Sequence, residues 1–151
     1  MEYTRQLGEY QLSTDKNRLD IAVLHRFLAE ESYWAKDIPL QTVERIVEHS
    51  LCFGLYHNDV FIGFARMITD ITSYAYLADV FILAEHRGKG LSKWMMQCVL
   101  EHPDLQGLRR IMLATRDAHG LYAQFGFKPL ETPEGFMQLH QPDVYRMDTD
   151  S

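Results

Sequence analysis

The sequence predicts a single α/β domain over residues 1–151, in which one mixed β-sheet carries helices on both of its faces. Three observations predict this fold class. The composition, 46% apolar, 12% aromatic and 24% charged, is that of one compact domain. Helical and strand periodicities follow one another along the chain. Consecutive hairpin-like strands precede a strand–helix–strand unit, and this combination mixes antiparallel with parallel pairing.

The N-terminal third predicts a strand, a helix, a loop and a second helix. Residues 10–13 have the pattern of a short strand. Apolar residues then recur at helical spacing over residues 17–30, and more briefly over residues 40–49. Between these two segments the period is lost and the chain reaches Pro39. We therefore expect a loop that joins two helices.

The middle of the chain predicts three strands and a helix. Two segments rich in strand formers, 51–56 and 60–69, flank a turn at residues 57–59, as in a β-hairpin. A third apolar run covers residues 73–83. The amphipathic segment 91–102 ends at Pro103, as a helix would. The remaining elements expected are a strand at 110–115, a short helix at 119–125, and closing strands at 127–130 and 136–147, with Pro142 at an edge or a bend.

Charge and cysteine content exclude several classes of protein. The net charge is −6, from 15 basic and 21 acidic residues, which argues against nucleic acid as a partner. No apolar stretch is long enough to cross a membrane, and no secretory signal is visible. Cys52 and Cys98 are too few for a disulfide framework, and the seven histidines form no metal-binding pattern. We expect a cytoplasmic protein without a metal ion.

The segment 85–92 is the best candidate for an anion site. It joins a buried strand to an amphipathic helix and contains Gly88 and Gly90, so backbone N–H groups and the helix N-terminus can approach a phosphate. Its basic residues also stand out in an acidic chain. The alternative is a solvated surface loop. P-loop, dinucleotide-binding and nucleophile-elbow patterns fail because Gly90, Lys93 and Trp94 occupy positions that those motifs reserve for other residues.

A second motif lies downstream, at residues 121–127, where Leu121 and Tyr122 precede Gly126 and Phe127. Together the two motifs resemble those of the GNAT superfamily of N-acetyltransferases. The family's first motif is Gln/Arg-x-x-Gly-x-Gly/Ala, which this chain matches at its glycines but begins with Glu85. The second is Leu-Tyr-x-x-x-Gly-Phe. The resemblance covers residues 10–147, and implies a central mixed sheet that splays between two parallel strands.

The resemblance also implies an acetyl-CoA-dependent transfer to an amine. The residues implied to bind acetyl-CoA are Val80, Phe81, Ile82, Arg87, Gly88, Lys89, Gly90, Leu91 and Ser92. Pantetheine would pair with the backbone of Val80 and Ile82, and the pyrophosphate with the amides of residues 87–92. The family role of general acid, which protonates the departing thiolate, falls on Tyr122. Independently of the resemblance, Asp79 and Glu31 are candidates for the base that removes the amine proton, directly or through water.

The acceptor site is expected in the loop after the first helix. Ser32, Tyr33 and Trp34 lie in this loop, where the aromatic rings could hold an amine by cation–π contact or simply cap the core. The loop at residues 70–76, with Tyr74, is expected to contribute. The acceptor is a small-molecule amine, a protein amine or an alcohol, and a homodimer remains open. The competing function is a non-catalytic acyl-CoA-binding module that regulates a partner.

Overall fold

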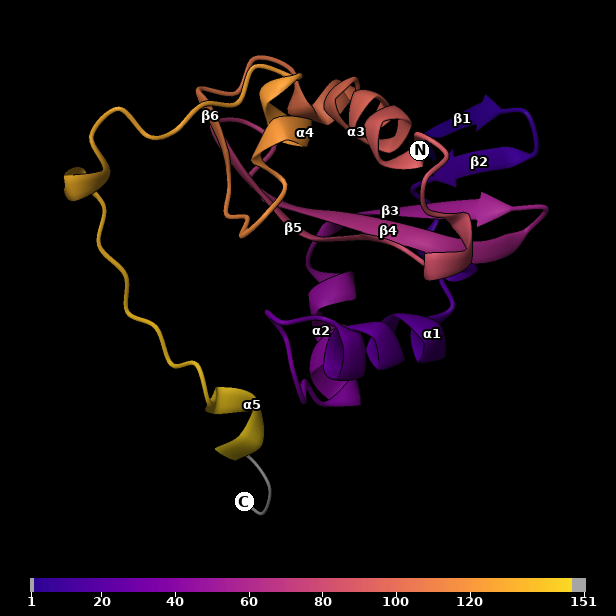
Figure 1. Ribbon diagram of the computed structural model, residues 1–151, viewed down its shortest axis with the longest axis horizontal. Coiled ribbons are helices and arrows are strands. Elements are labelled where there is room, and N and C mark those ends of the chain that lie inside the picture. Colours follow the sequence, from indigo (N-terminus) through magenta and orange to yellow (C-terminus); the bar gives the residue numbers. More distant parts are fainter. Residues whose placement is uncertain (1, 148–151) are drawn as a thin grey trace.

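The computed structural model describes residues 2–147 and consists of a six-stranded mixed sheet between two helical layers (Figure 1). The strands lie in the sheet in the order of the sequence. Neighbouring strands pair antiparallel except for the last two, which pair parallel. The predicted mixed sheet is thereby confirmed. The strands are β1 (Thr4–Leu7), β2 (Tyr10–Ser13), β3 (Leu51–His57), β4 (Val60–Thr69), β5 (Tyr74–Ile82) and β6 (Arg110–Leu113).

Helices cover both faces of the sheet, as expected (Figure 1). One face carries α1 (Ile21–Arg26) and α2 (Leu40–Glu48), and the other carries α3 (Leu91–Leu100) and α4 (His119–Ala123). The short α5 (Val144–Met147) lies near α1 and α2. Side chains alternate across β3, so Phe53 and Leu55 pack under α3 while Cys52 and Tyr56 face α1 and α2.

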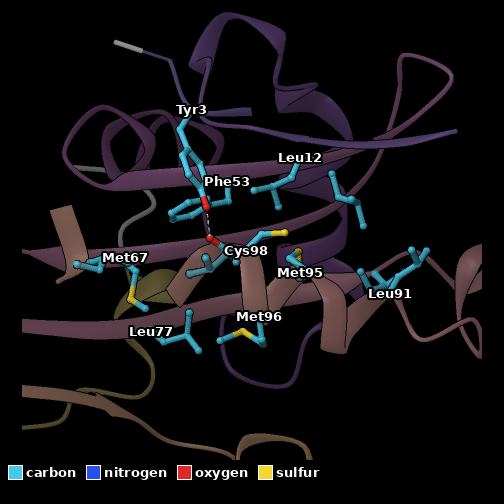
Figure 2. Packing of buried hydrophobic residues seen from close by; sticks show 14 of the residues in the cluster. Tyr3, Leu12, Phe53, Met67, Leu77, Leu91, Met95, Met96 and Cys98 are labelled. Atoms are coloured by element: carbon cyan, nitrogen blue, oxygen red, sulfur yellow. Dashed lines mark hydrogen bonds between the residues drawn. The ribbon is translucent and has the colours of Figure 1, made fainter. Parts of the chain in front are cut away.

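Each helical layer has its own buried cluster. Under α3, Met95 and Met96 pack against Leu12, Phe53 and Leu77, which come from the three strands β2, β3 and β5 (Figure 2). The N-terminal segment joins this cluster because the Tyr3 hydroxyl donates a hydrogen bond to the Cys98 carbonyl at 2.6 Å. Under α1, the rings of Phe27 and Phe81 stack with centroids 3.9 Å apart. The sheet is therefore buried on both faces along β3 and the centre of β4, whereas buried and half-buried residues alternate along β5.

The hairpin between β3 and β4 forms as the sequence predicts. Asn58 and Asp59 both have positive φ, 47° and 71°, which is the backbone geometry that two-residue hairpin turns require. The predicted helix at 17–30 is divided into a 3-10 turn at Lys16–Arg18, α1, and one turn of π-helix at Phe27–Glu31. The 3-10 turn ends at Arg18, and Asp20 then caps α1 by accepting a hydrogen bond from the Val23 amide.

Three expectations about strands were wrong. β1 was missed, because four exposed residues carry no alternation that a core would impose. The closing strands expected at 127–130 and 136–147 do not form: residues 127–143 pair with no strand, and α5 occupies the end of the second range. Alternation indicates which side chains could share a face, whereas a strand also needs a neighbouring backbone edge. Within the described residues, that neighbour is absent.

Candidate active site

The active-site candidate begins where β5 and β6 separate. Their parallel pairing runs from Tyr74 and Arg110 to Leu77 and Leu113, after which β6 ends and β5 continues to Ile82. In the part of the chain that the structure describes, no strand therefore lies beside this edge of β5 beyond Leu77. A cavity of about 670 Å³ opens at this point, lined by residues 76–80 of β5, residues 113–118 and the loop after α1. The predicted splay is confirmed.

A β-bulge lies on β5 beside this cavity. The register between β4 and β5 shifts opposite Phe64 and Arg66, and Asp79 takes a positive φ of 56°. Neither Asp79 nor Val80 has a partner in the register with β4. A non-glycine residue in this left-handed region is strained, and such strain occurs often at functional sites. Bulges are also a common means of aiming a side chain into an active site.

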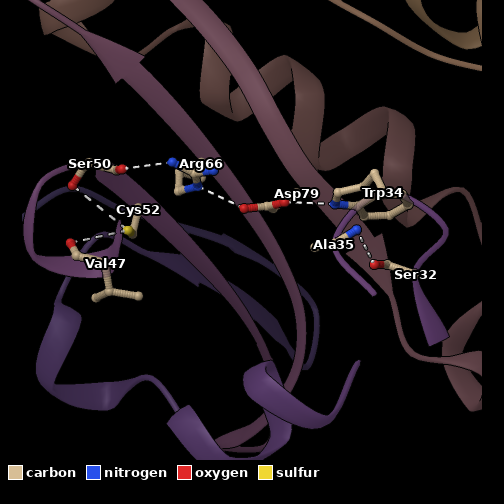
Figure 3. A network of polar contacts seen from close by, with 8 residues as sticks. All are labelled: Ser32, Trp34, Ala35, Val47, Ser50, Cys52, Arg66 and Asp79. Carbon is tan, nitrogen blue, oxygen red and sulfur yellow. Dashed lines mark hydrogen bonds and ion pairs between the residues drawn. The ribbon is translucent and has the colours of Figure 1, made fainter. Parts of the chain in front are cut away.

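The bulge holds Asp79 in a buried polar network (Figure 3). Its two carboxylate oxygens accept hydrogen bonds from the Trp34 indole at 2.7 Å and from Arg66 Nε at 2.8 Å. Arg66 also donates to the Ser50 hydroxyl at 3.1 Å. Asp79 is only 7% exposed, so these charge-assisted contacts offset the cost of burying its carboxylate. The network links the loop that follows α1, which contains Trp34, to the centre of the sheet.

The two candidate bases lie in different surroundings. Asp79 lines the large cavity, and each of its oxygens already accepts one hydrogen bond but retains a lone pair. Glu31 is exposed at the end of the π-helical turn and is not among the residues that line the cavity. Of the two, only Asp79 faces the space in which an acceptor could bind.

Tyr122 lies in α4 at the wall of the same cavity. It is 8% exposed, and its ring packs edge-on against Phe127 with centroids 6.0 Å apart. Burial raises the pKa of its hydroxyl, and the nearby Tyr33 raises it further. The phenol therefore keeps its proton at neutral pH. A buried, protonated hydroxyl at the splay can donate that proton to a group in the cavity.

The loop before α3 has the backbone that an anion site needs. Gly88 and Gly90 have φ of 78° and 77°, a region that L-residues avoid, and Gly90 is the N-cap of α3. A Cβ at either position would meet no other atom within 4 Å, so the requirement is for φ and for open space. No side chain caps the α3 amides. Those N–H groups remain available to an anion at the helix N-terminus.

The other residues of the predicted cofactor site face in several directions. Val80 lines the large cavity. Phe81, Ile82 and Leu91 are buried in the core, so they can meet a ligand only through their backbone. The basic and polar side chains of the loop are accessible, and Arg87 Nε donates to the Ile82 carbonyl at 2.8 Å. That contact ties the loop to the end of β5. Lys89 is exposed, and Ser92 is half-buried in the first turn of α3.

The predicted acceptor residues are only partly brought together. Tyr33 and Trp34 line the cavity and are 47% and 41% exposed. Ser32 is buried, and its hydroxyl donates to the Leu28 carbonyl and accepts from the Ala35 amide, so it braces the loop. Tyr74 lies at the other end of β5, outside both cavities, where its hydroxyl contacts the Met112 sulfur at 3.3 Å.

Three residues that the sequence analysis did not consider also line this cavity. The Arg116 guanidinium stacks 3.8 Å above the Tyr33 ring, and the Arg116 amide donates to the Tyr33 hydroxyl at 3.1 Å. Tyr145 reaches the cavity from α5. Arg66 could have been found, because an arginine in the apolar strand 60–69 needs a buried acidic partner. Arg116 and Tyr145 carry no comparable signal, since they lie in a loop and near the end of the chain.

Residues 2–147 contain neither a metal-binding cluster nor a membrane-spanning helix. In this described part of the chain, His, Cys, Asp and Glu side chains do not gather in threes or more in a way that could hold a metal ion. No helix in it is long and apolar enough to cross a membrane. Both cysteines are buried as free thiols, and burial raises the pKa of Cys52 to about 11.

Sequence comparison assigns the family. A sequence profile of the acetyltransferase (GNAT) family matches residues 19–127, which include the loop before α3 and Tyr122. The chain belongs to the GNAT acetyltransferase family. A protein of Gibberella zeae that is provisionally named an acetyltransferase is 34% identical over 139 residues, covering 78% of this chain and 77% of the relative.

Solved GNAT structures agree with the architecture. A GNAT-family protein of Xanthomonas campestris pv. campestris is 51% identical and superposes with a TM-score of 0.89, over 93% of this chain and 99% of that one. A protein of Clostridium acetobutylicum, crystallised with acetyl-CoA, is 13% identical with a TM-score of 0.60 over 93% and 96% of the two chains. The second likeness concerns the fold alone.

Proposed function

We propose that this GNAT protein transfers the acetyl group of acetyl-CoA to an amine by direct attack of the amine on the thioester. The observation that carries the proposal is the splay between β5 and β6. It joins a free backbone edge on β5 and the protonated hydroxyl of Tyr122 in one cavity of about 670 Å³. An extended thioester needs such an edge, and its leaving group needs a proton donor.

The donor half of the site is made mainly from backbone. Val80 lines the cavity and lies at the bulge without a partner in the β4 register, so its backbone is available to pantetheine. We assign the pyrophosphate to the amides of residues 87–92, where two glycines with positive φ open the chain and α3 begins. The N–H group near Val80 would stabilise the oxyanion of the tetrahedral intermediate.

Tyr122 would act as the general acid. The amine nitrogen forms a bond to the carbonyl carbon, the bond from that carbon to sulfur breaks, and the sulfur leaves with the electron pair. A thiol has a pKa near ~8.5, so the departing thiolate accepts a proton readily. Because burial raises the pKa of Tyr122, the phenol holds its proton throughout the neutral range. The proton would pass from this hydroxyl to the sulfur.

The acceptor half of the site is made from side chains. Tyr33 and Trp34 line the cavity and are partly exposed, and because Arg116 already stacks on the Tyr33 ring, the Trp34 ring would attract a cationic amine before it loses a proton. An alkyl amine has a pKa near ~10 and must be deprotonated to attack. We assign that proton to Asp79, directly or through water, because it is the candidate base that faces the cavity. The buried free thiols suit a reducing compartment, and we infer that the enzyme acts in the cytoplasm.

The replacement Tyr122→Phe tests this assignment because it removes the hydroxyl and keeps the ring. We expect kcat for thiol release from acetyl-CoA, measured with a panel of amines, to fall by about 100-fold or more. Acetyl-CoA affinity and the melting temperature should change little. Tyr56→Phe is the matched control: it removes another buried hydroxyl, from a tyrosine that lines neither cavity, and should leave kcat unchanged.

Two results would contradict the proposal in different ways. Turnover of Tyr122→Phe within about threefold of the parent, with product release shown not to be limiting, would mean that water or another group is the acid. Calorimetric binding of acetyl-CoA by the parent protein, without thiol release with any amine, would instead favour the non-catalytic acyl-CoA-binding module.

A further inference from the structure

Arg116 lines the active-site cavity from the loop between β6 and α4. Its guanidinium carbon lies 3.8 Å from the centre of the Tyr33 ring, and its backbone amide donates to the Tyr33 hydroxyl at 3.1 Å. The loop is itself braced, because the Thr115 hydroxyl accepts a hydrogen bond from the Ala118 amide at 3.0 Å. Two contacts with one ring therefore hold Arg116 against the loop after α1, on the acceptor side of the cavity.

The positive charge of Arg116 is not matched within the described chain. Arg66, which lines the same cavity, forms an ion pair of 2.8 Å with Asp79 (Figure 3). Arg146 forms one of 2.8 Å with Asp37 in the loop after α1. Among residues 2–147, by contrast, no carboxylate lies within 4 Å of the Arg116 guanidinium. A guanidinium that stacks through its face keeps the N–H groups of its edge, which match a carboxylate in a two-point contact.

The other charges at the cavity restrict the kind of acceptor. The charges of Arg66 and Asp79 cancel each other, so the cavity has no spare negative charge there for a second ammonium group. Asp117 follows Arg116 in the same loop and also lines the cavity. It would repel a dianion such as a phosphate group more strongly than a carboxylate, which carries one charge. The charges therefore favour an acceptor with one amine and one carboxylate.

The size and the walls of the cavity indicate a small acceptor. Its volume of about 670 Å³ is typical of small-molecule sites, and the thioester end of acetyl-CoA must occupy part of it. Ile38, Ile46 and Ile68 supply apolar wall, and the Trp34 ring is partly exposed beside them. An apolar side chain on the acceptor would therefore find contacts in the same space.

We propose that Arg116 binds the carboxylate of the acceptor, which makes the acetyl acceptor an amino acid with an apolar side chain. This inference rests on the proposed function, because it names the substrate class of the same site. The Arg116 guanidinium donates hydrogen bonds to the carboxylate, while the amine lies near Trp34 and Asp79 and faces the thioester. The carboxylate takes no part in the bonds that form and break. Arg116 is therefore a residue that determines specificity and not a catalytic residue.

Matched acceptors test this assignment in the thiol-release reaction with acetyl-CoA. Leucine, methionine and phenylalanine are compared with their amides and with the amines that lack the carboxyl group. In the parent protein, kcat/KM for each amino acid should exceed that for its amide by at least about 10-fold. Arg116→Gln should remove this preference by raising KM for the amino acids while kcat changes little, because the lost contact is the same in the ground state and the transition state.

Two further variants separate the carboxylate contact from a change in the fold. Arg116→Lys keeps the charge but not the two-point geometry, and should restore part of the preference for amino acids. Arg5→Gln is the matched control, because Arg5 is also exposed and stacks 4.1 Å from the centre of the Tyr3 ring but lines neither cavity. It should keep the full preference. The amides should react with Arg116→Gln at the same rate as with the parent protein.

The failure of this inference differs from the failure of the proposed function. Equal kcat/KM for amino acids and amides, or a preference that survives Arg116→Gln, would overturn the inference and leave the acetyl transfer intact. A preference for the phosphonate analogue of leucine over leucine would also overturn it, because the anion bound would then be phosphate-like.

If no amine releases thiol, the proposed function fails, and a binding measurement tests Arg116 without turnover. Leucine and leucinamide are titrated in a calorimeter into protein saturated with CoA. Tighter binding of leucine that is lost in Arg116→Gln would support the carboxylate contact. Equal binding of the two compounds would overturn it.

Discussion

The two ends of the six-stranded sheet differ in how completely their backbone is paired. From β2 to β4 the strands pair over most of their length, and the side chains at their centre, such as Phe53 and Phe64, are fully buried. Between β5 and β6 only four residue pairs form, and the chain opens into cavities on both sides of β6. The paired end supplies stability. The open end keeps a free backbone edge on β5 to which a ligand can bind.

The largest expected effect belongs to the paired end. Phe53→Ala removes a fully buried ring that packs against Tyr3 and His102, and should lower the free energy of unfolding by about 3–5 kcal/mol, measured by urea denaturation. Tyr33→Ala is the matched change at the open end. Because Tyr33 is nearly half exposed, its loss should cost less than about 1 kcal/mol of stability while it impairs turnover. Equal losses of stability would mean that the open end also belongs to the core.

The next effect concerns the backbone of the anion loop. Gly90→Val introduces a β-branched side chain where φ is 77° and where the phosphates should approach, so acetyl-CoA affinity in calorimetry should fall by more than about 100-fold. Gly107→Val is a close control: its φ is also 77°, and its Cβ would also meet no atom within 4 Å. The control carries the same strain and should keep its affinity. If both variants lose affinity for acetyl-CoA, backbone strain alone explains the loss in Gly90→Val.

The smallest effect is a loss of stability at alkaline pH, and it again belongs to the paired end. Burial raises the pKa of Cys52 from 9.0 to about 11. As the pH rises, the Cys52 thiol therefore ionises in the unfolded chain before it ionises in the folded chain. Its contribution to the free energy of unfolding is fully present below pH 9 and is lost as the pH rises toward about 11. The decline due to this thiol should reach about 2 kcal/mol. The hydroxyl in Cys52→Ser does not titrate in this range, so the free energy of unfolding of this variant, measured with urea, should depend less steeply on pH. If the variant and the parent protein show the same slope, Cys52 does not cause the alkaline loss of stability.

Sequence motifs identify some residues of the candidate site and miss others. Gly88, Gly90 and Tyr122 belong to local motifs, because a positive φ at a helix start and a hydroxyl on a short helix are properties of neighbouring residues. The partners of Asp79 are 45 and 13 residues away in the chain, so the network with Trp34 and Arg66 could not be read from spacing. Tyr74 illustrates the opposite case, since it belongs to the strand that forms the site but lies at the far end of that strand.

The sequence by itself determined the fold class, the order of most elements and the position of the glycine-containing loop before α3, because periodicity and glycine placement act over a few neighbouring residues. Only the tertiary structure decided which edges remain unpaired. The segments 127–130 and 136–147 are predicted as strands, yet residues 127–143 pair with no strand of the described chain and residues 144–147 form α5, because a strand needs a backbone edge beside it. The same cause makes Met137 and Leu139 exposed rather than buried. Pairing across long distances depends on where other elements leave space, and no local pattern contains that information.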